Sequence, residues 1–124
     1  IRDLMHQGAQ MPVVGPDTRV VDTLLEMTRK GLGLTAVVGP DGLVQGVFTD
    51  GDLRRALDRG AEALTTPVAA VMTRQCKTVQ VDMLAAEALR IMQDSKINAL
   101  LVVDASHALV GVLNMHDLLK AKVL

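Results

Sequence analysis

The chain has 124 residues, of which 49% are hydrophobic and 22% charged, and its formal net charge is -1. This balance is typical of a folded domain, and it argues against a disordered segment and against a strongly basic nucleic-acid binder. Aromatic stacking of bases is excluded because the chain has one Phe and neither Trp nor Tyr. The lone Cys76 cannot form an internal disulfide, and no apolar run reaches the roughly 20 residues of a membrane span, so we expect a cytoplasmic protein without membrane contact.

The chain contains two copies of one unit. At an offset of 65 positions, VVGPDGLVQGVFTDGDL (37–53) aligns with VVDASHALVGVLNMHDL (102–118). The opening segments IRDLM (1–5) and VAAVM (68–72) match after a further shift of two. We therefore predict two domains, 1–62 and 63–124. Because the chain opens without an initiator Met, we interpret it as a fragment of a longer protein.

In chain order, each copy reads as strand, helix, strand, strand, helix. Apolar residues at helical spacing, such as Val20 and Leu24 in the first copy and Ala85 and Leu89 in the second, indicate an amphipathic helix. We predict that Asp17 and Asp82 cap these helices.

Short apolar runs follow each helix and are suited to strands covered on both faces. Turns with Pro, Asp and Gly or similar residues come next, then second strands, then closing helices. The predicted ranges are strands 35–38 and 99–103, turns 39–42 and 104–107, strands 43–48 and 109–113, and helices 52–60 and 117–123.

The predicted fold is α/β, with two β-α-β-β-α repeats related by a pseudo-twofold axis. One repeat alone would leave an apolar sheet face uncovered and would be marginally stable. Pairing two repeats buries that face and leaves clefts between the copies, and each strand-to-helix corner would point into one. A duplicated corner implies a duplicated potential site.

The first corner places Thr49 and Asp52 on the first turn of a closing helix. A helix N-terminus favours an anionic ligand, and a carboxylate can accept two hydrogen bonds from the cis-diol of a ribose. The alternative is an N-cap, which contributes about 1 kcal/mol. One copy alone favours the cap, but the second copy repeats the aspartate as Asp117, with Asn114 in place of the threonine, which favours a ligand. The two roles are compatible.

Other kinds of site have weak support. The acidic residues of the first corner lack the remaining spacing of a calcium loop. His6, His107 and His116 are scattered in sequence, without the nucleophile of a catalytic triad. His116 adjoins Asp117 and is a candidate ligand contact, or else a solvated residue. We predict no metal, no cofactor and no catalytic residue in this chain.

The tandem units, each with a Gly-hydrophobic-hydrophobic-(Thr/Ser)-x-x-Asp corner and an opening segment that ends in Met, resemble the CBS domain pair over essentially the whole chain. The resemblance implies an intertwined pair, commonly dimerised, that binds nucleotides between its repeats and regulates an attached enzyme or transporter. The corner aspartate would contact ribose hydroxyls. Carried over by position, Thr49 and Asp52 would face Thr78, Asn98 and Ala99, while Asn114 and Asp117 would face Met11 to Val13, Leu34 and Thr35. Because Asn114 departs from the family pattern, we expect the two clefts to differ.

LLEMTRKGLGLTAVV followed by GVFTDGDLRRAL, with GVLNMHDLLKA in the second copy, is similar to the C-terminal CBS pair of bacterial arabinose 5-phosphate isomerases. This implies a regulatory fragment without its N-terminal sugar isomerase domain, from the pathway to Kdo, an acidic sugar of lipopolysaccharide. The expected ligand is CMP-Kdo by pathway logic, or ATP, ADP or AMP by the wider family. We expect allosteric feedback and a homodimer of CBS pairs within a homo-oligomer. The alternative is a structural oligomerisation module with no ligand.

Overall fold

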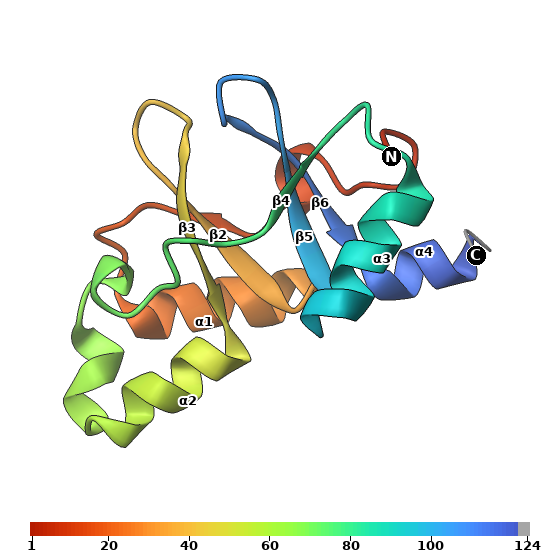
Figure 1. The fold of residues 1–124 in the computed structure, drawn as a ribbon. Helices are drawn as coiled ribbons and strands as arrows, with labels where there is room; N and C mark the ends of the chain where they lie inside the picture. Colours follow the sequence, from red (N-terminus) through yellow and green to blue (C-terminus); the bar gives the residue numbers. More distant parts are fainter. Residues whose placement is uncertain (122–124) are drawn as a thin grey trace. The chain divides into compact units, whose positions relative to one another are not determined.

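The computed structural model describes residues 1–121 and contains each predicted element twice. The first series comprises β1 (Val13–Val14), α1 (Val20–Lys30), β2 (Leu34–Val38), β3 (Val44–Thr49) and α2 (Asp50–Asp58). The second series comprises β4 (Thr78–Gln80), α3 (Ala85–Ser95), β5 (Ala99–Val103), β6 (Leu109–Asn114) and α4 (Met115–Lys120). Short 3-10 helices lie at Gly8–Gln10, Ala61–Thr65 and Val68–Ala70. The predicted order strand, helix, strand, strand, helix is confirmed (Figure 1).

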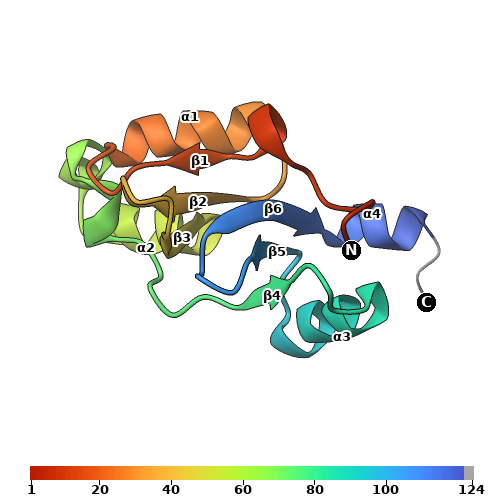
Figure 2. The same cartoon turned by 90° about the horizontal axis from the view of Figure 1, so that it is seen from above.

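Each series forms its own three-stranded sheet, in the orders β1-β2-β3 and β4-β5-β6 (Figure 2). In both sheets the first two strands are parallel and the last two are antiparallel. The registers correspond, because Val37 pairs with Gly46 and Val102 pairs with Gly111, and each hairpin has an irregularity one residue later. The internal repeat of the sequence is therefore a repeat of hydrogen-bonding register.

The chain divides into two compact units, each with one of these sheets. Pro12–Cys76 forms the β1–β3 unit, and Ile1–Met11 joins the chain from Lys77 onward in the β4–β6 unit. The predicted domains 1–62 and 63–124 divide the sequence, and that division stays a prediction. The compact units differ from it because the opening segment of each sequence repeat packs in the unit that holds the other repeat's sheet.

Both cores are built from the apolar runs and helical stripes seen in the sequence. Phe48 and Val37 are fully buried in the β1–β3 unit, and the mostly buried Met72 of the exchanged opening segment belongs to the same core. Met92 and Leu113 are fully buried in the β4–β6 unit, and Met5 of its opening segment joins them. The opening methionines are thus core residues, as expected of flexible side chains that fill irregular gaps.

The predicted caps of the first helices are wrong. The N-cap residues of α1 and α3 are Arg19 and Leu84, and neither makes a side-chain capping bond. Asp17 and Asp82 each lie in a turn that comes before the helix, since the chain makes one more hydrogen-bonded turn there before helical geometry begins.

The closing helices begin two residues earlier than predicted, at Asp50 and Met115. The reason is that Thr49 and Asn114 are themselves the caps, which places Asp52 and Asp117 inside the first turn. The predicted end of the second closing helix at 123 lies outside the described residues. None of the helices within residues 1–121 is both long and apolar enough to cross a membrane.

Candidate ligand site at the strand-to-helix corners

The first corner is closed by a set of hydrogen bonds around Asp52, whose exposed fraction is 2%. Its Oδ2 accepts the backbone N–H of Thr49 at 2.9 Å and the Thr49 hydroxyl at 3.1 Å. Its Oδ1 accepts Arg55 Nη2 at 2.6 Å and the Thr73 hydroxyl at 2.7 Å. Both carboxylate oxygens are thus satisfied within the β1–β3 unit, as a buried charge requires.

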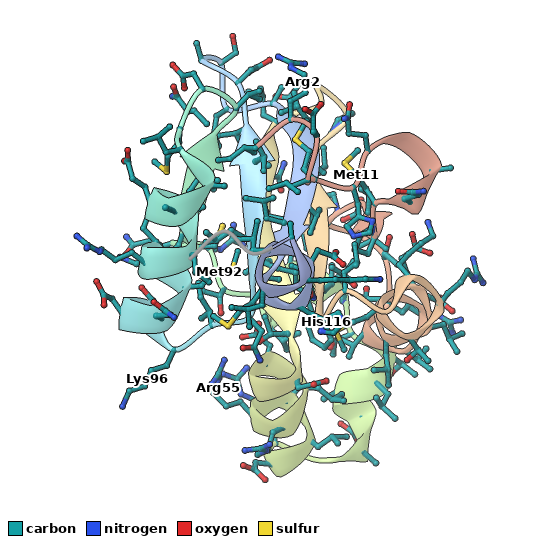
Figure 3. The ribbon with its side chains drawn as sticks, turned by 90° about the vertical axis from the view of Figure 1, so that its right-hand side faces the viewer. Arg2, Met11, Arg55, Met92, Lys96 and His116 are labelled. Atoms are coloured by element: carbon teal, nitrogen blue, oxygen red, sulfur yellow. The ribbon has the colours of Figure 1, made fainter. Side chains whose placement is uncertain are left out.

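The same contacts make the first corner a reciprocal helix cap. Thr49 Oγ1 accepts the backbone N–H of Asp52 at 3.4 Å while the Asp52 carboxylate accepts that of Thr49. The capping interpretation of the sequence is therefore confirmed for this pair. Arg55 covers the buried carboxylate, although its own side chain is 67% exposed; Figure 3 labels it on α2.

The second corner is more open. Asn114 caps α4, with its Oδ1 accepting the backbone N–H of His116 at 2.8 Å. The Asp117 side chain is 34% exposed, and its Oδ2 lies 2.6 Å from His6 Nε2. Among the described residues, His6 is the one side-chain partner of this carboxylate. The other oxygen, Oδ1, thus has no protein partner there.

Two residues outside the corner motif, Thr73 and His6, occupy the same structural position at the two corners. His6 exchanges backbone hydrogen bonds with Val112 at 2.8 and 3.0 Å, and Thr73 exchanges them with Val47 at 2.9 Å. Each thereby brings its side chain to the aspartate of its corner. The signal was present in the sequence, because both directly follow the methionine of an opening segment.

The identical glycines Gly46 and Gly111 are explained by the same segments. A Cβ on Gly46 would lie 2.6 Å from the Thr73 carbonyl oxygen and 2.9 Å from Met72 Sδ. A Cβ on Gly111 would overlap Met5 Sδ and lie 3.2 Å from the His6 carbonyl oxygen. Glycine is required at both positions because the opening segment lies directly against the strand.

Some predicted site residues meet a corner within their own unit. Leu34 pairs with Thr49, and Thr35 is fully buried one residue further along β2. Ala99 pairs with Asn114 in the second sheet.

The other predicted site residues have these positions. Asn98 is exposed, and its carbonyl accepts the backbone N–H of Met115 at 2.7 Å. Thr78 and Val13 begin β4 and β1, Met11 lies in the β4–β6 unit, and His116 is exposed at the start of α4 (Figure 3). The pairing of one copy's corner with residues of the other copy stays a prediction.

The described part of the chain contains no candidate metal site, because no three His, Cys, Asp or Glu side chains are grouped there so that they could hold an ion.

Burial raises the pKa of the half-buried Cys76 thiol, and a smaller opposing effect comes from a backbone hydrogen bond. The thiolate form of Cys76 is therefore disfavoured.

Comparison with known proteins identifies the repeat. The CBS domain family matches residues 1–59 and again residues 68–124. The arabinose 5-phosphate isomerase KdsD of Pseudomonas aeruginosa is 54% identical over 124 residues, which is 100% of this chain and 38% of that enzyme. The KdsD enzyme of Escherichia coli K12 is 44% identical over 123 residues, covering 99% of this chain and 37% of that enzyme. The chain thus spans well under half the length of these curated relatives.

Solved structures share the fold. CBSX2 in complex with AMP has a TM-score of 0.81 and 25% identity, covering 98% of this chain and 93% of that one. The cytosolic domain of the Mg2+ channel MgtE in complex with ATP has a TM-score of 0.76 and 26% identity, covering 94% of this chain and 46% of that one. With two family matches in one chain and this shared architecture, the chain belongs to the CBS domain family, as a tandem pair of CBS domains.

Proposed function

We propose that this chain is the regulatory region of a cytoplasmic arabinose 5-phosphate isomerase, and that it binds a nucleotide or nucleotide sugar to control an attached catalytic domain. The observation that carries the proposal is the 54% identity to the Pseudomonas aeruginosa isomerase across the whole of this chain. The sugar isomerase domain would precede Ile1 in the parent. This chain itself would supply no catalytic residue.

The proposed ligand is CMP-Kdo, with an adenine nucleotide as the alternative. Structures of related fold, CBSX2 with AMP and the MgtE domain with ATP, support a nucleotide. CMP-Kdo adds a carboxylate and is the activated product of the pathway to Kdo. Its ribose suits a corner aspartate, and cationic side chains would bind its phosphate and carboxylate.

We place the ribose at the second corner. A ribose diol would have to displace Arg55 or Thr73 to reach Asp52, and it would lose the hydrogen bonds they make. At Asp117 the oxygen Oδ1 is unengaged by the described residues, and His6 already orients the carboxylate. The geometry favours Asp117 as the ligand contact and Asp52 as a structural residue.

Binding at one corner is sufficient for feedback control. A ligand that prefers one conformer of the parent by about 1–3 kcal/mol would change its activity roughly 5- to 150-fold. No chemical step within this chain is needed.

The second candidate function is a structural oligomerisation module, which forms a homodimer of CBS pairs within a homo-oligomer of the parent and binds no ligand. The closed first corner favours it, because Asp52 there has the environment of a buried cap. Under this alternative no nucleotide would raise the melting temperature of the chain.

The test is calorimetric titration of the chain with CMP-Kdo, AMP and ATP. We expect saturable binding of at least one, weakened tenfold or more by Asp117→Asn. Asp94→Asn, at an exposed position on α3, is the matched control and should bind as the unmodified chain does. No heat with any of the three would contradict ligand sensing and leave the structural module. In the full-length parent, the bound ligand should change isomerase activity.

A further inference from the structure

The β4–β6 unit has a partly unpaired edge where β4 leads into α3. Among the described residues, no backbone hydrogen bond outside the helices and strands engages the Met83 carbonyl or the N–H groups of Leu84 and Ala85. Leu84 has an exposed fraction of 67%, the highest among the exposed large hydrophobic residues of the described chain. Beside this edge, a cavity of about 550 Å³ is lined by Ile1–Asp3, Gln80–Asp82 and Val103–Ala105. The edge thus combines an exposed apolar side chain, three backbone groups without a backbone partner among residues 1–121, and a neighbouring cavity.

In the β1–β3 unit the corresponding edge is covered. The covering residues, 64–67, come directly before the opening segment 68–72 that packs in this unit. The Val20 N–H donates to the Thr66 carbonyl at 2.9 Å, and the Val68 N–H donates to the Thr18 carbonyl at 2.7 Å. The side chain of Leu64, which lies four residues before Val68, packs against the core of that unit. Residues 64–68 therefore close the start of α1.

The two edges have the same local geometry. The Val71 and Met72 N–H groups donate to the Val68 carbonyl at 3.0 and 2.9 Å, and those of Leu4 and Met5 donate to the Ile1 carbonyl at 2.9 and 3.1 Å. The turns before the helices also match, since Thr18 N–H donates to Gly15 at 3.2 Å and Met83 N–H donates to Gln80 at 3.0 Å.

The difference between the edges lies in the covering bonds. By the offsets of the repeat, the hydrogen bond from the Val68 N–H to the Thr18 carbonyl corresponds to one from the Ile1 nitrogen to the Met83 carbonyl. Within residues 1–121 no backbone hydrogen bond joins Ile1–Asp3 to the stretch 81–85. Both the segment and the surface that would receive it are present, and only their pairing is missing.

We infer that the residues preceding Ile1 in the parent pair with the edge at Met83–Ala85, as residues 64–67 pair with the start of α1. The second residue before Ile1 corresponds to Thr66, and its carbonyl accepts the Ala85 N–H. The fourth residue before Ile1 corresponds to Leu64 and is apolar. The inference rests on the proposed function only in taking this segment as the link from the catalytic domain.

Pairing of this kind makes the link a structural part of the β4–β6 unit. A tether paired with the start of α3 passes on movements of that unit, which a flexible tether would absorb. The corner with Asp117 lies in the same unit. A ligand there therefore acts on the unit to which the link is attached.

The test compares this chain with the same chain extended by the parent's own eight residues before Ile1. Hydrogen exchange is measured at the Ala85 amide, with the Val20 amide, already bonded to Thr66, as the internal reference. We expect the extension to slow exchange at Ala85 at least tenfold, toward the rate at Val20, and to raise the melting temperature. An extension of eight Gly and Ser residues is the matched control and should change neither.

Unchanged exchange at Ala85 in the naturally extended chain would overturn the inference, as would equal protection by the Gly and Ser extension. Nucleotide titration of the same samples separates this result from the proposed function. Binding without added protection at Ala85 contradicts only the docked link. Protection without binding contradicts only ligand sensing.

Discussion

Asp52 and Asp117 have the same place in the repeat and opposite environments. Asp52 is 2% exposed with four hydrogen bonds to its carboxylate, whereas the Asp117 side chain is 34% exposed and has one side-chain partner, His6, within residues 1–121. The sequence predicted that the clefts would differ because of Asn114. The structure shows a further source of difference: Arg55 and Thr73 surround one carboxylate and His6 contacts the other. The contacts of Thr73 and His6 could not be predicted from the corner motif alone, since both residues reach it from another segment of the chain.

Replacing Asp52 by Asn should destabilise the chain by about 1–3 kcal/mol, because a buried acceptor becomes partly a donor facing the donors Thr49, Arg55 and Thr73. Asp117→Asn should cost about 0–1 kcal/mol, since its carboxylate is partly solvated and its one side-chain partner among the described residues, His6, is itself partly exposed. Urea unfolding of the two variants measures the difference. Equal costs would contradict the structural role of Asp52.

At the scale of elements, strands and turns were predictable and helix starts were not. Apolar runs and the Pro-Asp-Gly turn are local signals, and the Gly42 N–H indeed donates to the Gly39 carbonyl at 3.0 Å. An aspartate before a helical pattern is a weaker signal, because it also suits the turn in which Asp17 and Asp82 lie. The structure places the caps at Arg19 and Leu84.

The ends of α1 and α3 differ in the residue that adopts the left-handed conformation. Gly31 closes α1 at φ 68°, whereas Lys96 closes α3 at φ 56°. The Lys96 side chain points away from α3 into solvent (Figure 3), so it offsets little of the backbone strain. Lys96→Gly should therefore stabilise the chain by up to about 1 kcal/mol, because glycine adopts this conformation without steric cost.

Gly31→Ala is the matched control, because a Cβ at Gly31 would meet no atom within 4 Å and only backbone strain would change. Thermal unfolding should show Lys96→Gly above the unmodified chain and Gly31→Ala below it. A lower melting temperature for Lys96→Gly would show that its side chain stabilises the end of α3.

At the scale of the whole molecule, self-alignment reveals the repeat but leaves open which sheet each opening segment joins. Gly46 and Gly111 offer similar surfaces to similar segments, so the sequence fits either assignment. In the structure Met5 lies on Gly111 and Met72 on Gly46. The exchange of opening segments between the units depends on tertiary packing, and no local sequence pattern predicts it.

Removing Ile1–His6 should consequently loosen the unit that holds the second repeat's sheet. Met5 is 8% exposed in that core, and His6 bonds to Val112 and to Asp117. Hydrogen exchange should accelerate at the Val112 amide, while the Val47 amide, bonded to Thr73, keeps its protection. Faster exchange at Val47 alone would contradict the assignment of the segment.

The exchanged opening segments also bear on how such a chain arises. A single repeat such as 1–62 contains the Gly46 strand but not the Met72 and Thr73 that cover it, and its own Met5 and His6 are shaped for an equivalent strand. Two identical single repeats would each complete the other's core by exchanging these segments, as in a domain-swapped dimer. An ancestral gene encoding one repeat would then have produced an obligate homodimer. Duplication and fusion of that gene would have converted the intermolecular exchange of segments into an intramolecular one.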